Sequence, residues 1–194
     1  MAQKVEPLAF LEGLVADAAP RLLGCTIERT FNGHTLRGRI VEVEAYDQAD
    51  AASHSYKGRT PRTNVMFGPP GHLYVYFTYG MHYCCNVVVG PTEYGAAILI
   101  RAIEPLEGEA YMAKRRGGRR GLQTANGPAK LCQALAIDKS LNGHDLHKKP
   151  LVLIPGKALK SNQIVQSTRI GITQEKDKPW RFYIKDNPYV SKPQ

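Results

Sequence analysis

Residues 41–47 read VEVEAYD, a run in which acidic or aromatic side chains alternate with small apolar ones. In an extended strand alternate residues lie on the same face, so Glu42, Glu44 and Tyr46 share one face and the apolar residues between them share the other. This pattern predicts an amphipathic strand with one chemically active face. A strand at the protein surface could carry the same glutamates for solubility, so the stretch by itself leaves both interpretations open.

Length and charge limit the class of protein. The chain has 194 residues, of which 43% are hydrophobic, and this is enough to bury one core in a single domain spanning residues 1–194. Its 26 lysines and arginines exceed its 17 aspartates and glutamates, which leaves a net charge of +9. An excess of positive charge suits a polyanion as a partner, although many basic proteins bind none.

The sequence carries no pattern for secretion, membrane insertion or metal binding. Its opening residues are followed by no apolar run of signal-peptide length, and no stretch of about 18 uncharged apolar residues occurs. The four cysteines lack CxxC spacing and nearby histidine clusters. We therefore expect a cytoplasmic protein with reduced, buried cysteines, no membrane partner, no metal and no other cofactor.

Hydrophobic periodicity and turn signals predict a mixture of strands and helices. The dipeptide Asn32-Gly33 between two strand-like segments is a strong hairpin signal, and the second segment carries Glu44. Prolines at 20 and 128 suit the first turns of helices. The expected strands are 25–30, 35–45, 72–78, 83–89, 96–102, 151–154, 169–172 and 181–184, and the expected helices are 7–15, 20–24, 105–115 and 127–137.

Three segments are predicted to be exposed. Residues 58–71 are basic and rich in turn formers, which is typical of a loop. Tyr79-Gly80-Met81 resembles a tight turn between two strands, and such a turn would raise Tyr79 and Met81 above the surface. Residues 114–120 contain five basic residues in seven, a run that is most often a solvated loop but also suits contact with phosphates.

The residues able to do chemistry are a carboxylate, an arginine and a histidine. Phosphate-loop, nucleophile-elbow and HExxH motifs are absent, so nucleotide hydrolysis, acyl transfer and zinc proteolysis have little support. A glutamate such as Glu44 can activate water, and an arginine such as Arg101 can keep it ionised or hold a phosphate. As alternatives, Arg101 could be a structural ion-pair partner of Glu104 or Glu42, and His54 a satisfied loop histidine.

Aromatic and amide side chains also occur in the predicted strands. Tyr74 and Tyr76 share a face and offer flat surfaces on which a base can stack, although strand tyrosines are more often packing residues. Asn86 is more informative, because it lies in an apolar strand and a buried amide is costly without hydrogen-bond partners.

These motifs, in this order, resemble the alkyladenine DNA glycosylase (3-methyladenine DNA glycosylase) family, in a bacterial-type form. The resemblance implies an α+β fold, a single mixed domain around a curved antiparallel β-sheet with flanking helices, which agrees with the strands expected above. The matching segments cover nearly the whole chain: 37–46, 54–55, 60–62, 66–67, 73–76, 79–81, 86, 99–105, 126–132, 169–172 and 180–183.

The resemblance implies a role for each matched residue. Glu44 resembles the general base that activates water, and Arg101 the arginine that orients this water and the backbone of the flipped nucleotide. Asn86 resembles the residue that crowds the exocyclic amine of guanine and so excludes it. Tyr79, with Met81 beside it, resembles the side chain that fills the gap left in the duplex.

The base pocket and the backbone contacts follow from the same resemblance. Tyr46, His54 and Tyr76 resemble the walls between which the extruded base stacks, and the backbone at Ala52 and His54 resembles the group that reads its edge. No lysine falls at the matched catalytic position, so the resemblance implies an enzyme that does not cut the strand. The implied contacts to the DNA backbone are Arg59, Thr60, Lys130 and Gly171.

The implied activity is that of a monofunctional DNA glycosylase in base excision repair. Such an enzyme flips a damaged purine out of duplex DNA and hydrolyses its N-glycosidic bond, which leaves an abasic site. Purines alkylated at N3 or N7 are cationic, so aromatic walls favour them by cation–π attraction. The implied substrates are 3-methyladenine and 7-methylguanine, with hypoxanthine and ethenoadenine as further candidates, and the enzyme is expected to act as a monomer without a cofactor.

Two rival hypotheses come from other classes of protein. A DNA-damage-binding protein without catalysis would keep Tyr79, the basic loop and the aromatic face, yet would tolerate loss of Glu44. A glycosidase-like hydrolase would use Glu42 and Glu44 as a carboxylate pair, and two strand residues on one face are about 7 Å apart, which this chemistry allows. A basic surface and an intercalating turn have no purpose on a neutral sugar, which weighs against the second rival.

Overall fold

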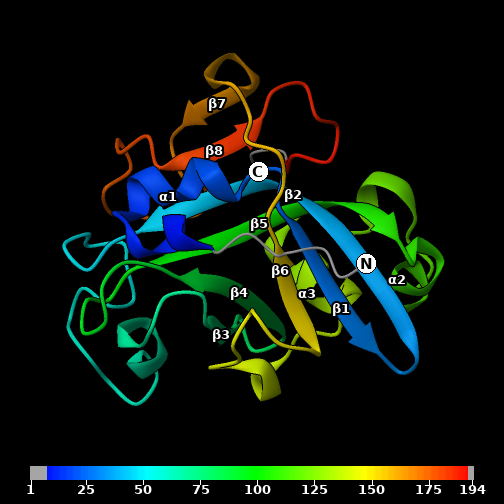
Figure 1. The fold of residues 1–194 in the computed structure, drawn as a ribbon, viewed down its shortest axis with the longest axis horizontal. Coiled ribbons are helices and arrows are strands. Elements are labelled where there is room, and N and C mark those ends of the chain that lie inside the picture. The colour runs from blue at the N-terminus through cyan, green and yellow to red at the C-terminus, as the bar shows by residue number, and fades with distance from the viewer. Residues whose placement is uncertain (1–7, 192–194) are drawn as a thin grey trace.

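A computed structural model describes residues 8–191 and places one eight-stranded sheet at the centre of the fold (Figure 1). The strand order is β3-β4-β5-β2-β1-β6, while β8 pairs with β2 and β7, and all pairings are antiparallel. The curled sheet and its flanking helices confirm the expected α+β class. The strands are β1 (Thr26–Phe31), β2 (His34–Tyr46), β3 (Leu73–Thr78), β4 (His82–Val88), β5 (Ala97–Glu107), β6 (Leu151–Ile154), β7 (Ile164–Ser167) and β8 (Arg181–Ile184).

Strand β2 carries the acidic residues into the middle of the sheet. It follows β1 through a turn at Asn32 and Gly33, whose φ angles of 48° and 77° give the left-handed conformations that a tight hairpin needs, so the hairpin prediction is confirmed. Because β2 pairs with β1, β5 and β8, residues 40–45 are buried throughout. Glu42 and Glu44 are fully buried, and the interpretation of them as surface groups is therefore wrong.

The pairing of β2 with β5 is irregular around Glu42 and Arg101. Val41 is an extra residue in β2 between residues paired with Ile103 and Ala102, and Arg101 is skipped on the β5 side directly afterwards. Bulges of this kind redirect side chains and are frequent near active sites. Here they bring Arg101 beside Glu42.

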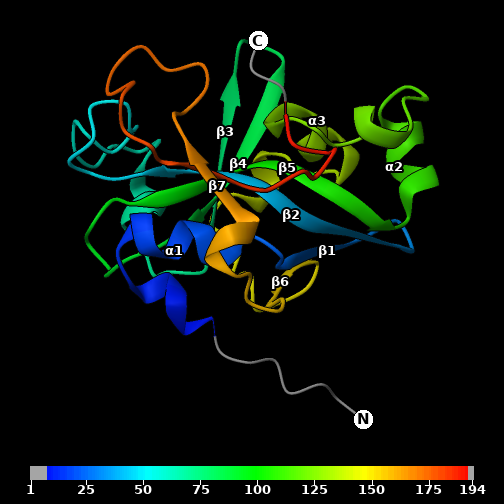
Figure 2. The same cartoon turned by 90° about the horizontal axis from the view of Figure 1, so that it is seen from above.

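Helices cover both sides of the central strands. Figure 2 shows α1 (Val15–Leu22) on one side, and α3 (Pro128–Ala134) with the β3–β4 hairpin on the other. The third helix, α2 (Glu109–Arg115), packs on α3 and β2. Short 3₁₀ turns cover residues Ala9–Glu12, Asn64–Phe67, Gly121–Gln123, Lys139–Leu141 and Ser161–Gln163.

The first expected helices, 7–15 and 20–24, are wrong in their boundaries. Residues 9–12 form only a 3₁₀ turn, and α1 runs through Pro20 in its second half. Its buried residues, Val15, Ala18, Ala19 and Leu22, follow an i, i+3, i+4, i+7 pattern, so burial of this apolar stripe outweighed the proline. The start of the expected helix, at Pro7, lies outside the described residues.

Three other expectations differ from the structure. Residues 105–107 extend β5 rather than begin a helix, because they pair with β2, and α2 begins only after Gly108. Residues 169–172 form a loop and not a strand, because the Ile170 N–H donates to the Glu44 side chain. The strand in this part of the chain is β7, which ends at Ser167. The loop at 58–71 is partly buried, because its 3₁₀ turn inserts Met66 and Phe67 into a small second core.

All four cysteines are buried and unpaired, as expected. No helix among residues 8–191 combines the length and apolarity needed to cross a membrane.

Candidate active site

A cavity of about 1090 Å³ opens between the β3–β4 hairpin, β5, α3 and the loops around residues 52 and 171. Glu44 does not line it, but its carboxylate lies directly behind the wall, bonded to three lining residues, Tyr46, Arg101 and Ile170. The structure therefore brings most of the predicted site together. The predicted residues that line the cavity are Tyr46, Ala52, His54, Tyr76, Tyr79, Asn86, Arg101, Lys130 and Gly171.

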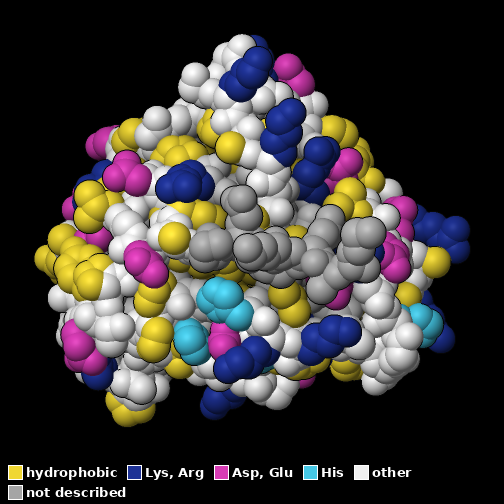
Figure 3. Space-filling view, in the orientation of Figure 1, with side chains coloured by type: hydrophobic (Ala, Val, Ile, Leu, Met, Phe, Trp, Pro, Cys, Tyr) yellow, Lys and Arg dark blue, Asp and Glu magenta, His cyan; other side chains and the backbone are white. Residues whose placement is uncertain are grey.

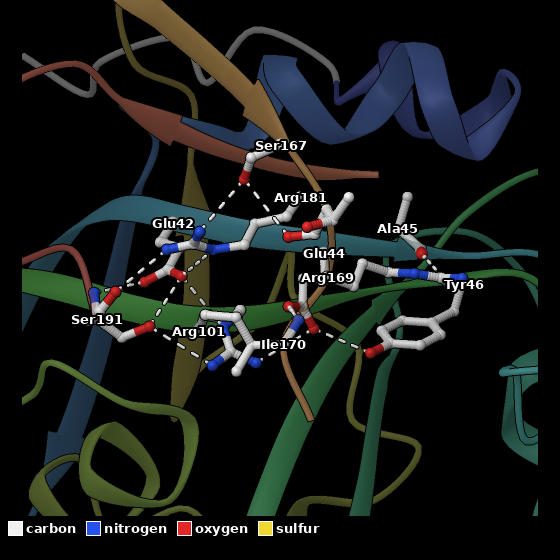
Figure 4. A network of polar contacts seen from close by, with 11 residues as sticks. Glu42, Glu44, Ala45, Tyr46, Arg101, Ser167, Arg169, Ile170, Arg181 and Ser191 are labelled. Carbon is white, nitrogen blue, oxygen red and sulfur yellow. Dashed lines mark hydrogen bonds and ion pairs between the residues drawn. The ribbon is translucent and has the colours of Figure 1, made fainter. Parts of the chain in front are cut away.

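The carboxylate of Glu44 accepts three hydrogen bonds. Oε1 accepts from the backbone N–H of Ile170 at 2.7 Å, and Oε2 accepts from the Tyr46 hydroxyl at 2.9 Å and from Arg101 Nη1 at 3.2 Å (Figure 4). A carboxylate offers about four lone-pair positions, so one acceptor position is left. This arrangement holds Glu44 in one orientation and leaves one acceptor position that no described residue occupies.

The two side-chain partners of Glu44 keep their protons. Burial raises the pKa of the Tyr46 phenol, and the neighbouring Glu44 charge raises it further, so the hydroxyl remains a donor. Burial alone would lower the pKa of Arg101, but attraction by Glu44 and Glu42 more than offsets this and raises it. Arg101 is therefore cationic at any physiological pH.

Glu42 anchors a second buried network, of which sequence reasoning offered only the pair with Arg101. Its Oε1 accepts from Arg101 Nε at 3.2 Å, Arg181 Nε at 2.7 Å and the Ser191 hydroxyl at 2.8 Å, while its Oε2 accepts from the Ser191 backbone N–H at 2.6 Å. Glu42 and Glu44 are thus balanced by Arg101 and Arg181 (Figure 4). Arg101 pairs with Glu42, as one alternative proposed, and not with Glu104.

A fully buried ion pair between Arg169 and Asp50 supports the loop that contacts Glu44. Arg169 also donates to the carbonyl of Ala45 at 2.9 Å, and its guanidinium lies 4.7 Å from the centre of the Tyr46 ring. Because Ile170 follows Arg169, this pair fixes the N–H that bonds to Glu44. Only the resemblance pointed to this segment, since nothing in its pattern distinguishes a buried arginine from a strand residue.

Three aromatic rings form one wall of the cavity. His54 Nδ1 lies 3.0 Å from the Tyr74 hydroxyl, and its ring meets Tyr76 edge to face at a centroid distance of 4.6 Å. Tyr74 stacks against Tyr76 at 5.7 Å. Tyr74 is fully buried, so the packing interpretation holds for it, while Tyr76 reaches the cavity with only part of its surface buried.

Several polar atoms at the cavity are free to meet a ligand. Asn86 is buried and donates through Nδ2 to the Tyr74 carbonyl at 3.1 Å, which leaves its Oδ1 unused within residues 8–191. The backbone N–H of His54 makes no hydrogen bond to any described residue, whereas the N–H of Ala52 is taken by Asp50 at 3.1 Å. At Ala52, the backbone group without a partner among the described residues is therefore the carbonyl.

The β3–β4 hairpin ends in a projecting turn, as its sequence predicted. Tyr79 and Gly80 have φ angles of 51° and 66°, and the Met81 N–H donates to the Thr78 carbonyl at 3.2 Å, as in a two-residue hairpin turn. Positive φ is unfavourable for a bulky residue such as tyrosine. Tyr79 is nevertheless 84% exposed and Met81 69% exposed. A strained residue at an exposed tip points to function.

The remaining predicted contacts fall in two places. Lys130 and Gly171 line the cavity, but Arg59 and Thr60 do not. Arg59 instead forms an ion pair with Glu93 at 2.5 Å, and Thr60 bonds within its own turn to Thr63.

Within residues 8–191 no group of three or more histidine, cysteine, aspartate or glutamate side chains could hold a metal ion.

His54 is expected to stay neutral at physiological pH. Partial burial, followed by the charge of Arg62, lowers its pKa to about 4. The neutral form is thus favoured in the folded protein, and this stability is lost as the pH falls from about 6.5, the ordinary value, through 4. We expect NMR titration of the His54 imidazole to show a midpoint near 4, assigned with a His54→Gln variant. A midpoint near 6.5 would contradict this environment.

Comparison with known proteins agrees with this geometry. Residues 9–188 match the methylpurine-DNA glycosylase family. A protein of Carboxydothermus hydrogenoformans is 53% identical over 96% of this chain and 98% of its own length. Relatives from Methanoculleus marisnigri and Rhodopseudomonas palustris are 49% and 47% identical, over 96% and 95% of this chain and 98% and 86% of theirs. All three carry 3-methyladenine DNA glycosylase as a provisional name. The chain therefore belongs to the methylpurine-DNA glycosylase family, whose members are hydrolases of N-glycosyl compounds.

Proposed function

We propose that this protein is a monofunctional DNA glycosylase that removes alkylated purines, chiefly 3-methyladenine and 7-methylguanine, from duplex DNA. Family membership supports the reaction class. The observation that carries the proposal is the carboxylate of Glu44, which three donors hold behind the cavity wall with one acceptor position left. Hypoxanthine and ethenoadenine are proposed as further substrates.

In the proposed reaction, Glu44 binds a water molecule and takes its proton. The water oxygen bonds to C1′ of the deoxyribose while the bond from C1′ to the purine nitrogen breaks, and the bonding electrons leave with the base. The transition state is an oxocarbenium-like ion, as in glycoside hydrolysis. A purine methylated at N3 or N7 already carries a positive charge and departs neutral, so it needs no general acid. Neutral hypoxanthine must be protonated as it leaves.

The aromatic wall supports selection of cationic bases. Tyr46 and Tyr76 line the cavity, and a cation over the face of such a ring is favoured by roughly 0.5–2 kcal/mol. A neutral His54 adds no repulsion to that cation. The buried Asn86, held by the Tyr74 carbonyl, is the proposed steric filter against the exocyclic amine of guanine.

Tyr79 is the proposed wedge that occupies the place of the flipped nucleotide. A Tyr79→Ser variant should bind duplex with a stable abasic-site analogue about tenfold more weakly, because stacking of an aromatic side chain on bases contributes roughly 1–3 kcal/mol. Equilibrium binding by fluorescence anisotropy measures this change. Phe77→Ser, at a half-exposed aromatic outside the cavity, is the matched control. Equal affinities of wild type and Tyr79→Ser would argue against the wedge.

The proposed function is tested by single-turnover release of base from a duplex with one hypoxanthine, and then from methylated duplex. Breaks that require both wild-type protein and subsequent alkali would support a monofunctional glycosylase. Breaks without alkali would contradict the absence of strand cleavage. If neither substrate releases base although lesion duplex is bound tightly, the non-catalytic DNA-damage-binding hypothesis is favoured.

The structure also bears on the glycosidase hypothesis. That mechanism needs a second carboxyl group facing the substrate. Neither Glu42 nor Glu44 lines the cavity, but four donors from Arg101, Arg181 and Ser191 surround the two oxygens of Glu42, one more than surround Glu44. Glu42 is therefore poorly placed to act on a sugar.

A further inference from the structure

Ser191 lies at the end of the described chain, outside residues 9–188 that match the family, yet it belongs to the site. It lines the cavity and is only 6% exposed. The segment before it is held by Asn187, whose side chain donates to Glu104 at 3.0 Å and accepts from the Tyr189 N–H at 2.9 Å. The segment thus carries Ser191 to the buried charges behind the cavity wall (Figure 4).

Both the backbone and the side chain of Ser191 bond to this charged network. Its N–H donates to Glu42 Oε2 at 2.6 Å, and its carbonyl accepts from Arg181 Nη2 at 3.1 Å. Its hydroxyl donates to Glu42 Oε1 at 2.8 Å and accepts from Arg101 Nη2 at 3.5 Å. A serine hydroxyl has one donor and two acceptor positions, so it can make both bonds at once. Since its proton is given to Glu42, Ser191 is not placed to protonate a leaving base.

The Ser191 hydroxyl is the third of three contacts that hold the Arg101 guanidinium. Nε of Arg101 donates to Glu42 and Nη1 donates to Glu44, each at 3.2 Å, while Nη2 donates to Ser191. The guanidinium is planar and rigid. Contacts at Nε and Nη1 alone leave it free to tilt about the line through these two atoms. A contact at Nη2 fixes its plane, because Nη2 lies off that line.

Burial makes this contact difficult to replace. Charged side chains are spread over the surface, as Figure 3 shows for one face of the molecule, and there solvent screens them. The side chains of Glu42 and Glu44 are by contrast fully buried, and that of Arg101 is 9% exposed. A water molecule that entered from the cavity could bond to Nη2, but it would be free to move. The hydroxyl is fixed by its covalent attachment and by its bond to Glu42.

We propose that Ser191 is a positioning residue for base release, because its hydroxyl fixes the plane of the Arg101 guanidinium beside Glu44. This inference rests on the proposed function, in which Glu44 and Arg101 act on the water and the flipped nucleotide. Nη1 and Nη2 of Arg101 each keep one N–H without a partner among residues 8–191. With the plane fixed, these N–H groups point in one direction and need not reorganise during the reaction.

The test compares Ser191→Ala with Ser167→Ala in single-turnover release of base at saturating protein. Both changes remove a hydroxyl from the same network, but the Ser167 hydroxyl accepts from Arg181 Nη1 at 3.2 Å and does not line the cavity. Release by Ser191→Ala should fall about tenfold, a factor typical of losing one hydrogen bond to a charged group. Ser167→Ala should keep the wild-type rate. Affinity of Ser191→Ala for a duplex with a tetrahydrofuran abasic-site analogue should change less than about twofold, because no charge is altered.

A second measurement does not depend on activity. Rotation about the Nε–Cζ bond of Arg101 exchanges its Nη1 and Nη2 atoms, and NMR of the guanidinium nitrogens measures this exchange, with Arg101→Lys to assign the signals. Exchange should be about tenfold faster in Ser191→Ala than in wild type or Ser167→Ala. Ser191→Cys keeps the size of the side chain but replaces the hydroxyl by a weakly bonding thiol, and it provides the same comparison should Ser191→Ala not fold.

Three results would overturn the proposal: equal release rates for the two alanine variants, equal exchange rates for Ser191→Ala and wild type, or a loss in Ser191→Ala that appears only in affinity. Failure of the proposed function is distinguishable from these. If wild type releases no base from any lesion, the catalytic proposal fails, while the exchange rate still reports on the contact between Ser191 and Arg101. Thermal unfolding of each variant shows whether it is folded under the conditions of both measurements.

Discussion

A Glu44→Gln variant should lose base release by about 10²- to 10⁴-fold, the contribution expected of a general base, while it still binds lesion duplex. Glutamine has nearly the shape of glutamate but cannot take a proton from water. The loss should appear in the rate at saturating protein and not in the dissociation constant, because the proton moves only in the transition state. This variant carries the largest effect that we expect on activity.

The environment of Glu44 predicts a second consequence of the same change. The carboxylate is surrounded by three donors, from Ile170, Tyr46 and Arg101. A glutamine has a single acceptor oxygen, so its NH₂ group must face at least one of these donors. We expect a loss of roughly 1–3 kcal/mol in the free energy of unfolding. Assays at low temperature keep the variant folded and separate this effect from catalysis.

The measurement is single-turnover release of hypoxanthine and of methylated purines, with alkali cleavage as readout. Glu107→Gln is the control, because it removes one negative charge from a half-exposed glutamate on the same sheet. Turnover by Glu44→Gln at a rate near that of Glu107→Gln would remove Glu44 from its proposed role. Tight binding without release by any protein, wild type included, would favour the binding-only hypothesis.

The sequence predicted those parts of the fold that local pattern determines. Asn32-Gly33 requires two residues with positive φ, and the structure has a hairpin there. The alternation in residues 41–47 predicted that Glu42, Glu44 and Tyr46 share one face. In the structure Arg101 pairs with both glutamates, and the Tyr46 hydroxyl donates to Glu44. The turn at Tyr79 was predicted for the same reason, since a glycine follows it within a short hairpin.

Contacts between residues far apart in the chain could not be predicted from local sequence pattern. The position of Arg101 depends on extra residues in both β2 and β5, and a one-residue irregularity leaves no signature in either strand alone. The expected strand at 169–172 is a loop because Arg169 pairs with Asp50, 119 residues earlier. The family resemblance identified Glu44 as the general base. Glu42 has the same local pattern, and only the folded structure shows how the surroundings of the two glutamates differ.

A Glu42→Gln variant should be destabilised by roughly 3–5 kcal/mol, the usual effect of removing one partner from a buried ion pair. Glu42 is fully buried and Arg181 nearly so, and the variant would place a neutral amide beside Arg181, whose other partners are the neutral oxygens of Ser167 and Ser191. A loss of this size is a large part of the 5–15 kcal/mol by which typical domains are stable. Urea unfolding measures it directly.

The control is again Glu107→Gln, because Glu107 also pairs with an arginine, Arg37, at 2.7 Å, but both side chains are nearly half exposed. An exposed pair contributes about 0–1 kcal/mol, so the two glutamine variants should differ by several-fold in their effect on stability. If the cost arises from an unpaired buried charge, adding Arg181→Gln to Glu42→Gln should cost less than the sum of the single changes. Additive losses, or a loss below about 1 kcal/mol for Glu42→Gln, would show that Glu42 does not neutralise Arg181. Glu42→Gln also removes the negative charge beside Arg101 Nε, so base release should fall even where the variant is fully folded.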